Sequence, residues 1–114
     1  EFRLSLVGSE MCIRDRLVLV PTANPENFSI VNTTLVPARA SENAMTIVYT
    51  NYCGSDNGLS FCGQSTIVGP LAQPLASAGP DDEDLLIADL SSINKIDAAL
   101  ISTQLTDFRK VLTK

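Results

Sequence analysis

The chain of 114 residues contains no histidine and no tryptophan, and only three of its residues are cysteines. Without histidine, the chain cannot supply an imidazole general base, a Ser-His-Asp triad or a histidine-ligated metal site. Three cysteines, Cys12, Cys53 and Cys62, are too few for the disulfide framework of a small secreted domain. We therefore expect reduced thiols and a cytoplasmic location.

Basic residues and long apolar runs are also scarce. Eight basic residues against thirteen acidic ones give a net charge of -5, which lacks the positive footprint that binds a phosphate backbone. No apolar run approaches the ~18 residues of a membrane helix, and the N-terminus lacks a signal-peptide pattern. We therefore expect neither a nucleic-acid nor a membrane partner. Hydrophobic residues make up 45% of the chain, enough to build one small domain or part of a larger one.

The first sixteen residues differ from the rest. Residues 1–16 carry three basic and three acidic side chains, so the whole net charge lies after Arg16. The string SLVGSEMCIRDR within them resembles a translated sequencing-adapter fragment that recurs at the ends of unrelated assembled transcripts. We interpret residues 1–16 as a non-native scar, in which case Cys12 is not a site. The alternative is an authentic amphipathic N-terminus with a partly buried Cys12.

Apolar and β-branched runs predict the strands of a sheet. Residues 17–20 have no polar member and stop at Pro21, which is typical of a strand buried on both faces. The next such run mixes β-branched residues with an aromatic one and ends at Asn51. A chain reversal at 71–74 leads into residues 75–78. The expected strands are residues 17–20, 46–50, 65–70 and 85–90.

A helix is predicted between the first two strands, because apolar residues recur there at spacings near three and four from Phe28 to Met45. Pro37 interrupts this pattern, so the helix is expected to kink there or to restart with Pro37 near its first position. Arg39 and Glu42, three residues apart, are expected to pair on its surface.

The remaining segments complete a mixed α/β sheet with helices on at least one face. Residues 54–58 tolerate positive φ and predict a turn. Residues 79–84 form an acidic turn that lacks the alternating ligand spacing of a calcium loop, so no metal is expected there. Ser91 or Ser92 is expected to cap a second helix that runs through Phe108.

The loop at residues 21–25 follows the first strand. In α/β folds such loops carry ligand contacts, which makes Asn24 a candidate pocket residue. The alternative is a turn asparagine that bonds its own backbone. Cys53 and Cys62 flank the predicted turn and could be bridged only if their α-carbons lie within about 7 Å. Buried, reduced thiols are expected instead.

Four segments in this order and spacing resemble the carbon-nitrogen hydrolase (nitrilase) superfamily, closest to its amidase-like and carbamoylase-like members. The resemblance runs continuously from Leu17 to about Leu90 and more loosely to Arg109, which corresponds to the C-terminal part of the usual domain. The segments are residues 17–25 (LVLVPTANP), 36–43 (VPARASEN), 48–54 (VYTNYCG) and 61–70 (FCGQSTIVGP).

The resemblance implies an α-β-β-α sandwich, with two units commonly packed through helices into a homodimer or higher homo-oligomer. Members of the family hydrolyse small amides, carbamoyl compounds or nitriles through a Cys-Glu-Lys set, without a metal or organic cofactor. In that mechanism a thiolate attacks the carbon, a carboxylate transfers protons and an ammonium group stabilises the charge that develops. Residues 17–114 would then be the C-terminal portion of such a domain, truncated at its N-terminus.

The family's Glu, Lys and nucleophilic Cys all precede the strand that corresponds to residues 17–20, so no catalytic residue is assigned here. Cys12 lies only five positions before Leu17, and its neighbours do not match those of the family's nucleophile. The residues carried over are Asn24, as the best candidate for substrate contact, and Arg39, Glu42, Asn43 and Asn51, as structural or pocket-supporting residues.

Three functions remain open on this basis. The first is a fragment of a carbon-nitrogen hydrolase whose parent is an enzyme but which is inactive alone. The second is a noncatalytic α/β interaction module that presents its acidic surface to a partner. The third is a cysteine hydrolase that works through Cys53.

Overall fold

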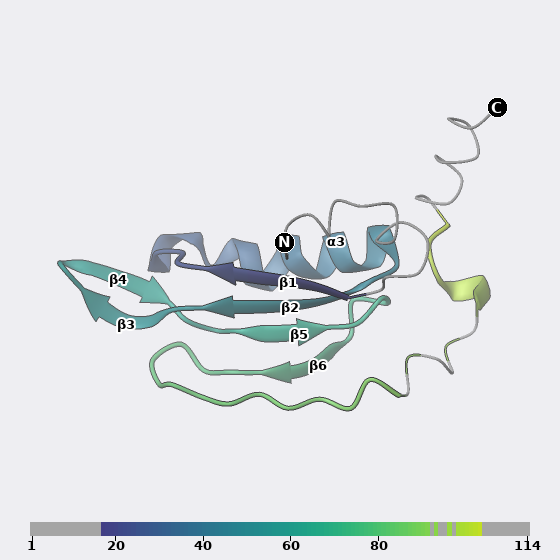
Figure 1. Cartoon of the computed structure of the whole chain (residues 1–114). Coiled ribbons are helices and arrows are strands. Elements are labelled where there is room, and N and C mark those ends of the chain that lie inside the picture. Colours follow the sequence, from purple (N-terminus) through teal and green to yellow (C-terminus); the bar gives the residue numbers. More distant parts are fainter. Residues whose placement is uncertain (1–16, 92, 94–95, 97, 104–114) are drawn as a thin grey trace, which may run out of the picture.

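The computed structural model describes residues 17–91, 93, 96 and 98–103 (Figure 1). Four strands form one sheet in the order β1-β2-β5-β6, in which β1 runs parallel to β2 and the other neighbours are antiparallel. The predicted mixed sheet is therefore confirmed. Its strands are β1 (Leu17–Thr22), β2 (Thr46–Asn51), β5 (Thr66–Val68) and β6 (Pro74–Ser77).

Strand β1 differs from its prediction. Among the described residues it pairs only with β2, so it is an edge strand and only partly buried, with Leu19 43% exposed. Pro21 lies inside the strand rather than ending it. An edge strand tolerates proline because the missing N–H can face away from the ladder. The prediction of burial on both faces is therefore wrong for the described chain.

The helical segment between β1 and β2 has three parts: η1 (Glu26–Phe28), the π-helix η2 (Val31–Leu35) and the α-helix α3 (Val36–Asn43). Pro37 stands in the first turn of α3, which confirms the predicted restart. Proline has no backbone N–H to donate to the preceding turn. In the first turn of an α-helix the N–H groups have no partner within that helix, so the loss costs little stability there. Ala44 ends α3 in the left-handed conformation, with φ of 54°.

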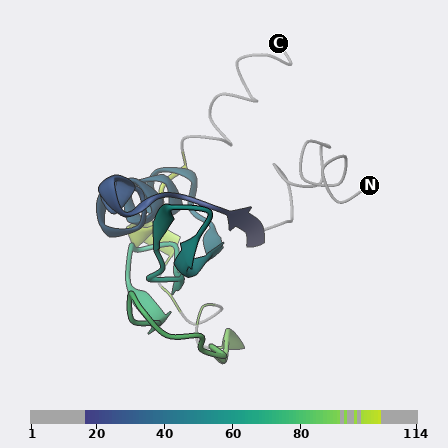
Figure 2. The same cartoon turned by 90° about the vertical axis from the view of Figure 1, so that its left-hand side faces the viewer.

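The core lies between α3 and one face of the sheet (Figures 1 and 2). Ala40 is fully buried, and the absence of a larger side chain there lets the helix approach the strands closely. Val18 and Val20 of β1 and Val31 of η2 pack against this core. Its buried members are Val36, Ala40, Met45, Ile47, Tyr49 and Val68.

A two-stranded hairpin extends beyond the sheet (Figure 1). It consists of β3 (Cys53–Asp56) and β4 (Leu59–Cys62), joined by Asn57 and Gly58. Both turn residues have positive φ, at 51° and 80°, as a two-residue turn that matches the twist of a hairpin requires. The predicted turn at 54–58 is thus confirmed, although the turn itself consists of only the last two of these residues.

The described residues after β6 form no further strand. The strand predicted at 85–90 is therefore wrong, and Leu85 and Ile87 are each 81% exposed. An apolar run forms a strand only where a neighbour offers a ladder. Nearby, the backbone N–H of Ser91 donates to Asp89 and lowers the pKa of that carboxyl.

The second predicted helix is described only in part. Its described portion contains the 3-10 helix η4 (Ala98–Leu100) and no α-helix, and the positions from 104 onward, Phe108 included, lie outside the described residues. No helix in the described part of the chain is long and apolar enough to cross a membrane.

Replacing Ala40 by leucine tests the packing of α3 on the sheet. Ala40 is fully buried, so Ala40→Leu should lower the free energy of unfolding by about 1–3 kcal/mol through overpacking. Ala38→Leu, on the exposed side of the same helix, is the matched control and should change it by less than about 0.5 kcal/mol. Urea denaturation followed by circular dichroism measures both, and equal effects would contradict this packing.

Candidate functional site

The parallel strands β1 and β2 end at the same edge of the sheet, where Thr22, Asn24 and Asn51 meet. In open α/β sheets, ligands bind outside the carboxyl ends of the strands. The sequence placed Asn24 and Asn51 near a pocket, and the structure brings the two side by side. Their roles in binding stay predictions.

The Asn51 carboxamide joins the segments that converge at this edge. Its Oδ1 accepts hydrogen bonds from the backbone N–H of Asn24, at 2.7 Å, and from the Thr22 hydroxyl, at 3.1 Å. Its Nδ2 lies 3.3 Å from the Asn24 carbonyl oxygen, 3.2 Å from that of Gly63 and 3.0 Å from Cys62 Sγ. One side chain thus links the end of β1, its own strand and the end of the hairpin.

The Asn24 side chain is positioned by a hydrogen bond to Tyr49. Asn24 Nδ2 donates to the Tyr49 hydroxyl at 2.6 Å, and Tyr49 is only 1% exposed. The alternative interpretation supposed that the Asn24 side chain bonds its own backbone. Its carboxamide instead bonds a tyrosine of the core. The Asn24 carbonyl also accepts the backbone N–H of Cys62, at 3.1 Å.

Sequence reasoning missed three members of this cluster: Tyr49, Cys62 and Ser65. Tyr49 could have been found, because a period of two places it on the same face of β2 as Asn51. Ser65 Oγ accepts the backbone N–H of Asn51 at 2.9 Å, a contact between segments that no local pattern encodes.

Gly63 is a position at which the structure requires glycine. Its φ is 56°, and a Cβ added there would collide with the backbone of Pro80. Its N–H donates to the Tyr52 carbonyl at 2.9 Å, which closes the base of the hairpin. The glycine thus allows the segment after β6 to cross beside the Asn51 cluster.

A cleft of about 530 Å³ opens beside the cluster. Asn51, Gln64 and Ser65 contribute to one wall, and residues 82–86 form the other. This second wall brings three carboxylates, and no basic residue lines the cleft. The electrostatics therefore favour a neutral or cationic small molecule over an anion. Asn24 is not among the lining residues; it supports the cleft through Asn51.

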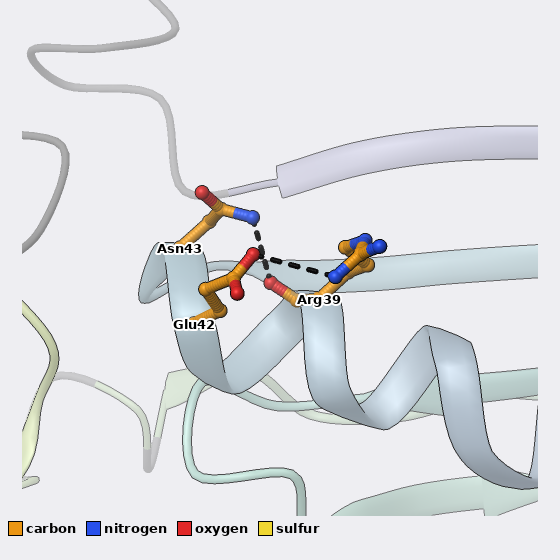
Figure 3. Close-up of polar contacts among 3 residues, drawn as sticks. All are labelled: Arg39, Glu42 and Asn43. Carbon is orange, nitrogen blue, oxygen red and sulfur yellow. Dashed lines mark hydrogen bonds and ion pairs between the residues drawn. The ribbon is translucent and has the colours of Figure 1, made fainter.

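Arg39, Glu42 and Asn43 lie elsewhere, on α3 (Figure 3). Asn43 precedes the start of β2, whereas Asn51 is its last residue, so the two sets stand at opposite ends of that strand. The predicted pair is present: Arg39 Nη1 and Glu42 Oε1 are 3.5 Å apart, with side chains 62% and 48% exposed. Asn43 Nδ2 donates to the Arg39 carbonyl at 3.0 Å. The structure thus divides the five predicted residues into a strand-end pair and a helix-surface set.

Among the described residues, no group of three or more Cys, Asp or Glu side chains is arranged to hold a metal ion. All four acidic residues of the segment 79–84 are exposed.

A mixed α/β layer with a polar cluster at the carboxyl ends of its parallel strands is the class of protein that these observations define. The family model of carbon-nitrogen hydrolases matches residues 4–96. The chain therefore belongs to the carbon-nitrogen hydrolase family, as the resemblance of its four segments indicated.

Individual relatives are amidases or hydrolases. A hydrolase encoded in the pqqF 5' region of Pseudomonas protegens is 37% identical over 110 residues, which cover 96% of this chain and 36% of that protein. An (R)-stereoselective amidase from Pseudomonas sp. is 37% identical over 80 residues, or 69% of this chain and 27% of that protein. A mutant amidase from Nesterenkonia sp. AN1, in complex with butyramide, superposes with a TM-score of 0.63 and 44% identity over 75% of this chain and 33% of its own.

The chain thus spans about a third of the length of the relatives it matches. The family match begins at residue 4, inside the segment 1–16 that we interpret as non-native, and this interpretation stays a prediction.

Removing the Asn51 carboxamide tests its linking role. Asn51→Ala leaves the part-buried N–H of Asn24 and the carbonyls around it without their partner, so it should cost about 1–3 kcal/mol of unfolding free energy. Asn43→Ala removes one hydrogen bond on the helix surface and is the matched control, with an expected effect of less than about 0.5 kcal/mol. Urea midpoints report both, and a neutral Asn51→Ala would refute the role.

Neutralising Glu42 tests the helix-surface pair. Because both side chains of the Arg39–Glu42 pair are largely in solvent, Glu42→Gln should change the unfolding free energy by less than about 0.5 kcal/mol, at low and at high salt alike. A loss well above this value, measured by urea denaturation, would show that Glu42 has a further partner.

Proposed function

We propose that this chain is part of an amidase-type hydrolase that cleaves carbon-nitrogen bonds other than peptide bonds. In this proposal the Cys-Glu-Lys set lies in the part of the parent protein that the chain does not contain. Membership of the carbon-nitrogen hydrolase family supports the reaction class. The observation that carries the proposal is the match to an amidase with butyramide bound, over a third of its length.

The proposed reaction uses a thioester. The parent's thiolate attacks the amide carbon, and the developing oxyanion is stabilised by the ammonium group. The carboxylic acid protonates the nitrogen, ammonia or an amine leaves, and water then hydrolyses the thioester to the acid with the carboxylate as base. The chemistry is supported by a form of the Nesterenkonia amidase with the acetamide moiety of fluoroacetamide added covalently at its active site cysteine.

The described thiols lack the surroundings that this chemistry needs. Cys62 is 5% exposed and its Sγ lies against Asn51, whereas Cys53 stands at the start of a hairpin strand. Within the described part of the chain, Arg39 on α3 is the only basic side chain, so neither thiol has a lysine beside it there. This favours the fragment over a hydrolase that works through Cys53.

The face of the sheet opposite α3 supports the proposed α-β-β-α sandwich. Alternation along the strands places the core residues on the helix side, and Leu19, Val48, Ile67 and Ala76 on the other. The strand register puts these four in one row across β1, β2, β5 and β6. Ile67 of this row is already buried, whereas Leu19 is 43% exposed. A second sheet would cover the exposed part of the row, at about 25 cal/mol per Å² buried.

A homo-oligomeric, cytoplasmic parent remains part of the proposal. Packing between helices is supported by three exposed apolar side chains on the helical segment, Phe28, Ile30 and Leu35. In this arrangement Arg39, Glu42 and Asn43 stand on the same helical layer. Asn24 does not line the described cleft, so its proposed contact with the substrate would lie in a part of the parent's pocket outside that cleft. Asn51, which bonds the backbone of Asn24, supports the residue there.

A chimera tests the proposed function. The Nesterenkonia amidase would receive residues 17–114 of this chain in place of its own aligned segment. We expect the chimera to release ammonia from butyramide, and a version without the amidase's active-site cysteine to release none. The 114-residue chain alone should also be inactive, because it lacks the thiolate, acid and ammonium group acting together.

Two outcomes would contradict the proposal. One is ammonia release by the chain alone at a rate that rises with its concentration. The other is a chimera that folds like the intact amidase, by circular dichroism, but hydrolyses no amide; this would favour the noncatalytic interaction module.

A further inference from the structure

Cys53 and Cys62 face each other across the hairpin. They are the first residue of β3 and the last of β4, the two strands of the hairpin in Figure 1, and the antiparallel register pairs them directly. Both are free thiols in the structure. From the sequence, a disulfide bridge between them was possible only if their α-carbons lie close enough together.

The hydrogen bonds around the pair fix its type. The backbone N–H of Cys62 donates to the Asn24 carbonyl, at 3.1 Å, and not to Cys53. The neighbouring pair is closed by the N–H of Gly63, which donates to the Tyr52 carbonyl at 2.9 Å. Because bonded and non-bonded pairs alternate along an antiparallel ladder, Cys53 and Cys62 form a non-hydrogen-bonded pair, with α-carbons about 4.5 Å apart. This spacing lies within the range that disulfides span, about 4.4–6.8 Å.

The two thiols differ in access. Cys53 is half-buried and lines the cleft, so a small oxidant can reach it. Cys62 is 5% exposed, and its sulfur is positioned by Asn51 Nδ2 at 3.0 Å. An accessible thiol beside a shielded one is the arrangement of an attacking and a resolving cysteine.

We propose that Cys53 and Cys62 are a site of reversible oxidation, which a peroxide converts into a disulfide across the hairpin. The Cys53 thiolate attacks one peroxide oxygen and the O–O bond breaks, which leaves a sulfenic acid and a hydroxide. The hydroxide takes up the proton that the Cys53 thiol released and becomes the first water. The Cys62 sulfur then attacks Cys53 Sγ, and the hydroxyl leaves as a second water with the Cys62 proton. Overall two thiols lose two protons and two electrons, and the peroxide is reduced to two waters. A dithiol reductant reverses the step.

The bridge would form next to the Asn51 cluster. Closing it engages the sulfur that Asn51 contacts and ties together the two hairpin strands at the end nearest the cleft. This site does not depend on the proposed hydrolase function, because it involves no residue of the Cys-Glu-Lys set.

Mass spectrometry of the full chain tests the proposal. The chain carrying Cys12→Ser, so that only two thiols remain, is treated with hydrogen peroxide and its remaining thiols are alkylated. We expect a mass decrease of about 2 Da, for the two hydrogens lost, that dithiothreitol reverses. Cleavage before Asp56, which lies between the two cysteines, should yield two peptides joined through Cys53 and Cys62.

The next non-hydrogen-bonded pair of the same hairpin provides a matched control. Ser55 faces Ser60, with hydroxyl oxygens 3.2 Å apart. Ser55→Cys with Ser60→Cys, in a chain that also carries Cys53→Ser and Cys62→Ser, should link under the same treatment. Alkylation of both Cys53 and Cys62 after peroxide, while the control pair links, would overturn the proposal. Failure of both pairs to link, or crosslinks only between chains, would overturn it as well.

Discussion

The carboxamide of Asn51 is the interaction on which the arrangement of this site depends. Two parallel strands end at one edge of the sheet. The backbone N–H and C=O groups that follow them have no strand partner and need other hydrogen-bond partners. Asn51 offers an acceptor to the N–H of Asn24 and donors to the carbonyls of Asn24 and Gly63. A side chain with both donor and acceptor at this position satisfies groups from three segments at once.

This constraint explains how a small layer of structure can support a pocket. The core under α3 holds β2 in place, β2 carries Tyr49 and Asn51, and these two fix the loop that bears Asn24. Site precision of this kind depends on supporting residues whose own positions are locked by packing and hydrogen bonds. The described chain supplies such support, and the amidase of Nesterenkonia sp. AN1 that it matches is more than twice as long.

Local sequence patterns correctly predicted the start of the helix near Pro37 and the strand at 46–50. The restart at Pro37 follows from its missing N–H, and the strand 46–50 from its β-branched residues. The strand at 85–90 was predicted wrongly, because its apolar side chains say nothing about whether a neighbouring strand is present. Asn24 was found from its place after a strand and Asn51 from the family resemblance, but Cys62 and Ser65 join them only through long-range contacts that a linear pattern does not contain.

The most direct measurement is the sequence of the native gene upstream of the codon for Leu17. The account predicts an open reading frame that continues upstream of this codon and encodes a glutamate, a lysine and then a cysteine at a predicted strand-to-helix turn. A start codon immediately before Leu17, with no such residues upstream in frame, would contradict it.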